Sequence, residues 1–259
     1  MSERIIAKKE GAVGWLIFNN PERRNAVSID MWEAIPSVLA KFAADDEMRV
    51  LVLAGAGDKA FVSGADISQF ENQRSSADAV QHYEQIAEQA QLGIQSFDKP
   101  VIAMIRGYCL GAGVNIANVC DLRIAAEDAR FGIPAAKMGL GYRASSMKNL
   151  VDTVGAPNAR EIMITGRQFS AAEAKAMGLV HHVVAVSELQ NFTATLCSDI
   201  AANAPLTMRA AKRIIREVTT KDYDAALCKS WVKECFESED YKEGRKAFME
   251  KRKPVFHGK

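Results

Sequence analysis

Residues 100–115 read Pro100-Val-Ile-Ala-Met-Ile-Arg-Gly-Tyr-Cys-Leu-Gly-Ala-Gly-Val-Asn115. The apolar run Val101–Ile105 is typical of a strand that is buried on both faces in a parallel sheet. The glycines that follow permit a tight turn and a close approach of the backbone to a ligand. Because the turn opens a predicted helix, its free N–H groups suit an anion or an oxyanion. Plain turn geometry is the competing interpretation of these glycines.

Strands of the same kind occur on either side of this segment. Arg49–Ala54 and Leu122–Ala126 are also apolar runs, and a second glycine-containing turn, Phe61-Val-Ser-Gly-Ala-Asp-Ile67, follows the first of them. Helices are predicted between the strands, one after Ser28 and one over residues 77–97. Strands that alternate with helices indicate an α/β fold with crossover connections.

The first predicted helix has an unusual interior. It begins after Ser28 and contains Pro36. Because proline lacks the N–H of a helical hydrogen bond, we expect this helix to kink or to end early. Before it, residues 4–10 and 12–18 are strand-like segments that predict a hairpin.

The second half of the chain changes in character. Ser170-Ala-Ala-Glu173 is a capping box that starts a helix, and Gly178 stops that helix before a strand predicted over residues 179–184. From Ala204 to the C-terminus, the sequence predicts helices only. We therefore divide the chain into an α/β core, residues 1–195, and a C-terminal helical region, residues 196–259.

The composition excludes several functional classes. With 259 residues, 48% hydrophobic and 25% charged, the chain is typical of a globular protein, and its formal net charge of +1 favours neither nucleic acid nor an anionic membrane. No apolar run approaches the ~20 residues that span a bilayer, and the mixed charged and apolar residues 1–10 argue against a secretory signal. Five cysteines without a CxxC pair give no metal-binding spacing. These features predict a cytoplasmic protein with reduced thiols.

Several separate motifs together resemble the crotonase superfamily, which comprises enoyl-CoA hydratases and isomerases. They are residues 100–113, residues 61–67, Met177-Gly-Leu-Val180, and Cys120-Asp-Leu-Arg-Ile-Ala-Ala-Glu-Asp-Ala-Arg-Phe-Gly132. Residues 243–256 resemble the closing helix and tail of the same family. The motifs occur in the family's order over nearly the whole chain, which makes the resemblance specific.

The resemblance implies a fold and a substrate. The fold would be a spiral of ββα units with a C-terminal helical region that packs homotrimers, often paired into hexamers. The substrate would be an acyl-CoA thioester, with no cofactor, no metal, no nucleic acid and no membrane partner. Its thioester oxygen would accept hydrogen bonds from two backbone N–H groups, which correspond to Ala65 and Ala112. Glycine is usual at the second position, a departure that a backbone donor tolerates.

Other residues match the stretches with which the family binds CoA. Asn25 and Ala26 correspond to the loop that follows the pantetheine and the phosphates. Gly64 lies in the second glycine-containing turn, and Asp66 and Ile67 correspond to the stretch that lines the adenine end. For the arginines just before Asn25, a solvated loop is the competing interpretation.

The two catalytic glutamates of the family's hydratases are missing. They would stand at the positions of Asn115 and Ala135. Asparagine forms hydrogen bonds but takes no proton, and alanine does neither. General acid–base catalysis needs a titratable group within reach of the substrate. The sequence therefore predicts that hydration by two glutamates is not available here, and an isomerase that uses the second glutamate is disfavoured too.

The segment after Ala135 differs from that of a hydratase. Residues 137–150 read Lys137-Met-Gly-Leu-Gly-Tyr-Arg-Ala-Ser-Ser-Met-Lys-Asn-Leu150, which resembles the methylmalonyl-CoA decarboxylases of the superfamily, where a tyrosine matches Tyr142. Tyr142 would orient the departing carboxylate or protonate the enolate, and Asn115 or Arg143 would hold the carboxylate. The competing interpretation places Tyr142 and Arg143 in a surface loop and pairs Asn115 with the backbone.

Three functional hypotheses follow. The first is an enzyme that stabilises a thioester enolate without paired glutamates, with decarboxylation of a malonyl-type CoA as one concrete reaction. The second is an enoyl-CoA hydratase or isomerase with replacement catalytic residues. The third is a non-catalytic member that binds acyl-CoA or acts as a scaffold.

Overall fold

The computed structural model describes residues 3–66 and 77–259, and its core is a large sheet. Within these residues the sheet has six strands in the order β1-β2-β3-β5-β7-β10. The strands are β1 (Ile5–Glu10), β2 (Val13–Phe18), β3 (Val50–Gly55), β5 (Val101–Ile105), β7 (Leu122–Ala126) and β10 (His182–Val184). β1 and β2 form the predicted antiparallel hairpin, and every later pairing in this sheet is parallel.

A smaller sheet lies beside the first. Its described strands are β4 (Ala60–Val62), β6 (Tyr108–Leu110), β8 (Arg130–Gly132) and β9 (Phe169–Ser170). The chain alternates between the sheets: a strand of the large sheet is followed by a strand of the small sheet and then by a helix. β3, β4 and α3 form one such unit, and β5, β6 and α4 form the next. The predicted ββα arrangement is confirmed.

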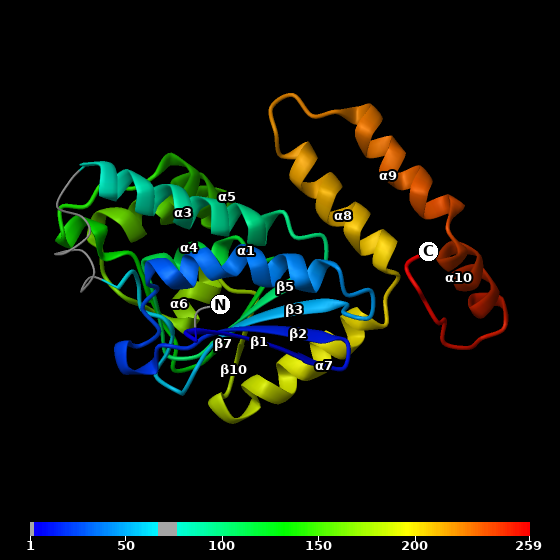
Figure 1. Cartoon of the computed structure of the whole chain (residues 1–259), viewed down its shortest axis with the longest axis horizontal. Helices are drawn as coiled ribbons and strands as arrows, with labels where there is room; N and C mark the ends of the chain where they lie inside the picture. Colours follow the sequence, from blue (N-terminus) through cyan, green and yellow to red (C-terminus); the bar gives the residue numbers. More distant parts are fainter. Residues whose placement is uncertain (1–2, 67–76) are drawn as a thin grey trace.

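Helices cover both faces of the large sheet (Figure 1). The helices of the core are α1 (Ile29–Ala43), α3 (Ala77–Gln95), α4 (Ala112–Asn118), α5 (Ala144–Thr165), α6 (Ala171–Ala176) and α7 (Leu189–Ala201). Along β3, Leu51 and Leu53 belong to the core that includes α1, whereas Val50 and Val52 pack with α7. Because side chains alternate between faces, a strand covered on both sides is apolar at every position.

The prediction for the first helix allowed a kink or an early end, and the early end is wrong. Helix α1 begins after Ser28 as expected, but it continues through Pro36 to Ala43. Proline removes one backbone hydrogen bond and costs about 3 kcal/mol in a helix interior. The buried side chains on either side of it, including Ile35 and Leu39, attach the helix to the core and offset that cost.

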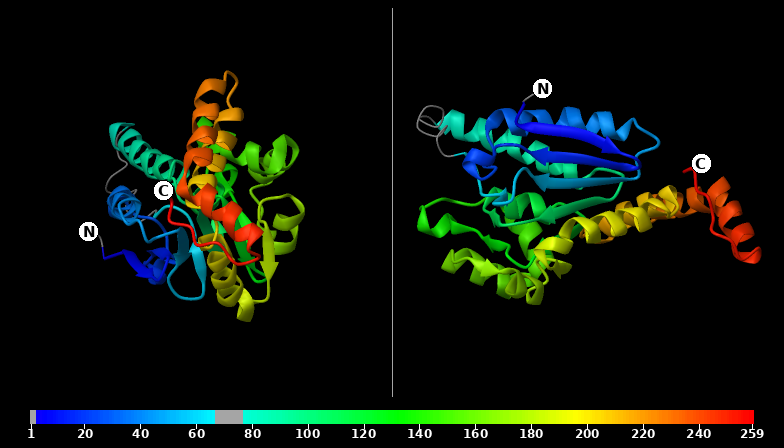
Figure 2. Two further views of the ribbon diagram at one scale, coloured as in Figure 1. Left: turned by 90° about the vertical axis from the view of Figure 1, so that its right-hand side faces the viewer. Right: turned by 90° about the horizontal axis from the view of Figure 1, so that it is seen from below.

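The C-terminal helices extend away from the two sheets (Figures 1 and 2). They are α8 (Pro205–Val218), α9 (Ala225–Glu237) and α10 (Glu239–Met249), so the prediction of a helical C-terminal region is confirmed. Residue 195 lies within α7, which packs on the sheet, and the arm itself begins only after Ala201. We would therefore place the division of the chain after Ala201.

Two local predictions have different outcomes. The capping box is present, because Glu173 N–H donates to Ser170 Oγ at 3.2 Å and Ser170 N–H donates to the Glu173 carboxylate at 2.8 Å. The strand predicted over residues 179–184 is shorter than expected and covers only His182–Val184. In the described part of the chain, no helix combines the length and the apolar character that a bilayer-spanning segment requires.

Candidate active site

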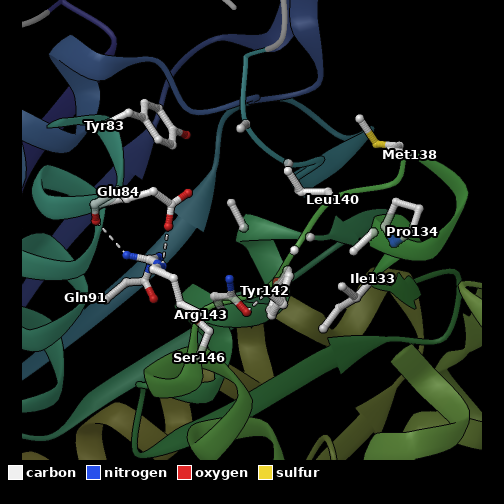
Figure 3. Close-up of a pocket in the computed structure, with 18 of the residues that line it drawn as sticks. Tyr83, Glu84, Gln91, Ile133, Pro134, Met138, Leu140, Tyr142, Arg143 and Ser146 are labelled. Atoms are coloured by element: carbon white, nitrogen blue, oxygen red, sulfur yellow. Dashed lines mark hydrogen bonds and ion pairs between the residues drawn. The ribbon is translucent and has the colours of Figure 1, made fainter. Parts of the chain in front are cut away.

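A pocket of about 200 Å³ lies where the two glycine-containing turns meet helices α3 and α5 (Figure 3). Its walls come from segments that are far apart in the sequence. Its lining residues are Trp32, Ser63, Gly64, Ala65, Tyr83, Glu84, Ala87, Gln91, Gly111, Ala112, Asn115, Ile133, Pro134, Ala135, Met138, Leu140, Gly141, Tyr142, Arg143 and Ser146. All five residues predicted to be catalytic are among them, and so is the lost glutamate position Ala135.

Ala65 and Ala112 bring two backbone N–H groups to the pocket wall. Ala65 forms an isolated parallel bridge with Val27, in which the hydrogen bonds use the neighbouring groups of residues 64 and 66. Ala112 is the first residue of α4, where a helical N–H has no partner within the helix. Neither N–H has an acceptor among the described residues. Ala65 and Ala112 thus line the same pocket with backbone N–H groups that the described chain leaves without acceptors.

Gly113 is the residue that allows the two turns to approach each other. A Cβ atom at this position would lie 2.2 Å from the carbonyl oxygen of Val62, which is far shorter than any real contact. Helix α4 therefore rests directly on the backbone of β4. Gly111, just before the helix, has φ +53°, a conformation that glycine adopts without strain. These two glycines explain the turn geometry, and they also place Ala112 opposite the Ala65 turn.

Tyr142 and Asn115 form a hydrogen-bonded pair in the pocket. The Tyr142 hydroxyl donates to Asn115 Oδ1 at 2.8 Å, although the residues are 27 positions apart. Asn115 is buried, and its side chain is hydrogen-bonded to Tyr142 and not to the backbone. Burial raises the pKa of the Tyr142 phenol above its ordinary value, and the hydrogen bond to Asn115 opposes this only in part. The phenol is therefore neutral near pH 7 and acts as a hydrogen-bond donor.

Arg143 enters the pocket together with a residue that the sequence did not single out. Its Nε lies 2.8 Å from Glu84 Oε2, and its Nη1 donates to the Glu84 carbonyl oxygen at 2.7 Å. Figure 3 shows this pair at one side of the pocket. The spacing of Tyr83, Glu84, Ala87 and Gln91 places them on one face of α3, which is the signal that could have pointed to Glu84.

The residues matched to CoA binding have different surroundings. The Asn25 side chain is completely buried and holds its loop, because Nδ2 donates to the carbonyls of residues 56 and 60, at 2.9 and 2.7 Å. A ligand contact from Asn25 would have to use its backbone. Ala26 is buried beside it, and Gly64 lines the pocket. Asp66 forms an ion pair with Arg23 at 2.8 Å, and Ile67 lies outside the described residues.

The model of the enoyl-CoA hydratase/isomerase family matches residues 8–259. The chain belongs to this family. A short-chain-enoyl-CoA hydratase of Clostridium acetobutylicum is 34% identical over 96% of this chain and 95% of its own length. A peroxisomal Delta(3,5)-Delta(2,4)-dienoyl-CoA isomerase of Arabidopsis thaliana is 33% identical, and the match covers 98% and 96% of the two chains.

Solved structures of the enoyl-CoA hydratase/isomerase family share the fold over the full length of this chain. A putative family protein from Hyphomonas neptunium is 37% identical, with a TM-score of 0.94 over 98% of this chain and 97% of that one. A protein from Magnetospirillum magneticum described as an enoyl-CoA hydratase/carnithine racemase also has a TM-score of 0.94, at 33% identity, and it covers 100% of this chain and 97% of its own. Acyl-CoA thioesters are thus the substrates expected of this family member.

In this family member, His181 is not among the pocket residues and has a structural role. Its Nδ1 accepts a hydrogen bond from the backbone N–H of Arg123 at 3.1 Å, which requires an unprotonated nitrogen. Burial and then the charge of Arg123 lower the pKa of His181 from 6.5 to about 4. The unfolded chain therefore binds a proton at a higher pH than the folded chain does.

The low pKa of His181 predicts how stability depends on pH. The contribution of this histidine is fully present above about pH 6.5 and is lost as the pH falls towards 4. Urea unfolding midpoints measured between pH 7.5 and 4.5 should therefore decrease more steeply in the wild type than in His181→Gln, which has no group to protonate. Equal slopes for the two proteins would contradict this role.

Proposed function

We propose that this protein forms and stabilises the enolate of an acyl-CoA thioester without a pair of glutamates. The observation that carries the proposal is the juxtaposition of two backbone donors, at Ala65 and Ala112, with the neutral Tyr142–Asn115 pair. Donors placed where negative charge develops lower the barrier to its formation. The positions of the hydratase glutamates, Asn115 and Ala135, present no carboxylate to the pocket.

Decarboxylation of a malonyl-type CoA is the reaction that these groups support best. The bond between Cα and the carboxylate carbon breaks, its electron pair forms the enolate, and CO₂ leaves. The thioester oxygen, now negatively charged, accepts from the two N–H groups, and a proton then reaches Cα. No strong base is needed, because bond cleavage itself generates the enolate. The Tyr142 hydroxyl, which lines this pocket beside Asn115, is the group that we expect to orient the carboxylate or to deliver the proton.

A hydratase or isomerase with a replacement carboxylate is the second candidate. Glu84 supports it, because this residue places a carboxylate in the pocket from a different helix than the missing glutamates. The names of the relatives from Clostridium acetobutylicum and Arabidopsis thaliana point in the same direction. Its weakness is that the Glu84 carboxylate is already engaged in an ion pair with Arg143 at 2.8 Å, so a substrate would have to compete with Arg143 for it.

One assay separates these reactions. A panel of CoA thioesters, which includes malonyl-type, 2-enoyl and 3-enoyl compounds, is incubated with the protein in deuterated water and followed by mass spectrometry. Loss of CO₂ with deuterium at Cα supports the first candidate, and gain of water or a shifted double bond supports the second. Binding without turnover or exchange at Cα would contradict both and would indicate a non-catalytic member.

Replacing Tyr142 by phenylalanine tests the role of the phenol. The variant keeps the ring but removes the donor to Asn115, and we expect kcat for the best substrate to fall by about 10²-fold. If the reaction is decarboxylation, Arg143→Ala should also reduce turnover, because the Glu84 carboxylate without its partner would repel the substrate carboxylate. If both variants turn over the best substrate at the wild-type rate, the assignment of this segment is wrong.

We also propose that the C-terminal arm assembles homotrimers, or dimers of trimers. The arm carries apolar side chains on its surface: Phe248 is 83% exposed, Met249 is 80% exposed and Phe236 is 59% exposed. Burial of such side chains between subunits would stabilise an assembly by about 25 cal/mol per Å². Light scattering in solution gives the mass that distinguishes the two forms.

A further inference from the structure

Two polar side chains in the pocket lack hydrogen-bond partners. Ser146 is 3% exposed and its Oγ has no partner among the described residues, not even the carbonyl one helical turn earlier. Gln91 is 6% exposed and lines the same pocket, and its amide forms no hydrogen bond within the described part of the chain. A buried polar group left unsatisfied is costly. Ser146 Oγ is such a group, and the Gln91 amide in the same pocket is also without a hydrogen bond, so a ligand there can supply partners for both.

The charge beside these residues is balanced. Arg143 lies next to them in the pocket, and Glu84 pairs with it at 2.8 Å. The positive and negative charges therefore cancel at short range. A second carboxylate placed there would be repelled by the charge of Glu84, whereas a neutral group would not. The pocket at this point favours a neutral hydrogen-bonding group over an anion.

The polar residues gather on one side of the pocket. Figure 3 shows Gln91, Arg143 and Ser146 on the side of Glu84. The opposite side carries the apolar side chains of Ile133, Pro134, Met138 and Leu140. A purely aliphatic acyl chain would pack against the apolar side but would leave the Gln91 amide and the Ser146 hydroxyl without hydrogen bonds. The asymmetry therefore discriminates between acyl groups.

We propose that this pocket selects acyl-CoA thioesters whose acyl group carries a neutral hydrogen-bonding substituent, a hydroxyl or a carbonyl, beyond Cα. Gln91 and Ser146 bind that substituent, and both offer a donor and an acceptor. This proposal rests on the proposed function in one respect: the thioester must enter the pocket with its carbonyl at Ala65 and Ala112. It adds a substrate class, which the enolate chemistry alone does not specify.

Binding of thioesters of matched length, which carry neither a double bond nor a carboxylate on Cα, tests the proposal. Calorimetry compares hexanoyl-CoA, 6-hydroxyhexanoyl-CoA and adipoyl-CoA, and then pentanoyl-CoA, 4-oxopentanoyl-CoA and glutaryl-CoA. In at least one set, the neutral polar compound should bind about tenfold more tightly than the aliphatic one, because two neutral hydrogen bonds are gained. It should also bind more tightly than the compound with a terminal carboxylate.

Three variants assign the preference to the two side chains. Ser146→Ala and Gln91→Met should each reduce the preference for the neutral polar group to about threefold or less, without weakening binding of the aliphatic compound. Ser145→Ala is the matched control: Ser145 donates to Glu88 at 2.5 Å and is not a lining residue, so the preference should stay as in the wild type.

The outcomes separate this inference from the proposed function. If the aliphatic or the carboxylate compound binds most tightly, or if neither pocket variant changes the preference, the polar selection is wrong although the acyl-CoA site stands. If no thioester binds, the acyl-CoA site itself is contradicted and this inference fails with it. Exchange of the Cα hydrogens in deuterated water, measured on the same compounds, reports enolate formation independently of chain selection.

Discussion

Replacement of Ala112 by proline should lower kcat by about 10²–10³-fold, the loss typical when one oxyanion donor is removed. The substitution removes the N–H and leaves the helix in place, because Ala112 is the first residue of α4 and proline is favoured there. Gly111 already has φ +53° and ψ −110°, outside the α region that a following proline disfavours. Circular dichroism should therefore show an unchanged fold.

Ala112→Gly is the matched control, because it changes the side chain but keeps the donor. It should retain kcat within a few-fold. The fall in the proline variant should appear in kcat more than in the Kd of an unreactive thioester, since the donors act on charge that develops during the reaction. A proline variant with wild-type kcat would contradict the role of this N–H.

Gly113→Ala should destabilise the protein by about 2–3 kcal/mol and also reduce activity. Alanine is the better helix former by about 1 kcal/mol, so propensity alone predicts stabilisation. The clash outweighs this gain and makes the change in unfolding free energy destabilising. The new Cβ would lie 2.2 Å from the Val62 carbonyl oxygen, and a backbone atom in β4 cannot rotate away. Helix α4 must move off the strand, and Ala112 moves with it.

Gly141→Ala provides the comparison for stability. A Cβ at Gly141 has nothing within 4 Å, so its unfolding free energy should stay within about 0.5 kcal/mol of the wild type. Urea unfolding of both variants measures the difference, and kcat/KM of Gly113→Ala reports the displaced donor. A Gly113→Ala protein as stable as the wild type would show that α4 does not depend on this close approach.

Patterns within short segments predicted much of the fold. The continuous apolar run Val101–Ile105 is a strand with helices on both sides, and the capping box at Ser170 is present as expected. Local chemistry decided these features, so local sequence was sufficient. Pro36 shows where local sequence is not sufficient: the local rule allowed an early end of the helix, but α1 continues to Ala43 because its buried face attaches it to the core.

The site was predicted in part for the same reason. The glycine-containing turns and the missing glutamates were visible in the sequence, and so were Ala65, Ala112 and Tyr142 as pocket residues through the family resemblance. Glu84 was not predicted. Its helical spacing shows which residues share its face, but not that this face meets Arg143, 59 positions later in the chain.

The sequence by itself determined the family, the ββα order and the absence of carboxylates at Asn115 and Ala135, because each of these depends on residue types and their order. Only the tertiary structure decided which polar groups are paired. The Tyr142 hydroxyl is bonded to Asn115, the Asn25 side chain is used within its loop, and Ser146 Oγ has no partner in the described chain. Such pairings depend on distances between segments far apart in sequence, which packing of the two sheets and their helices sets.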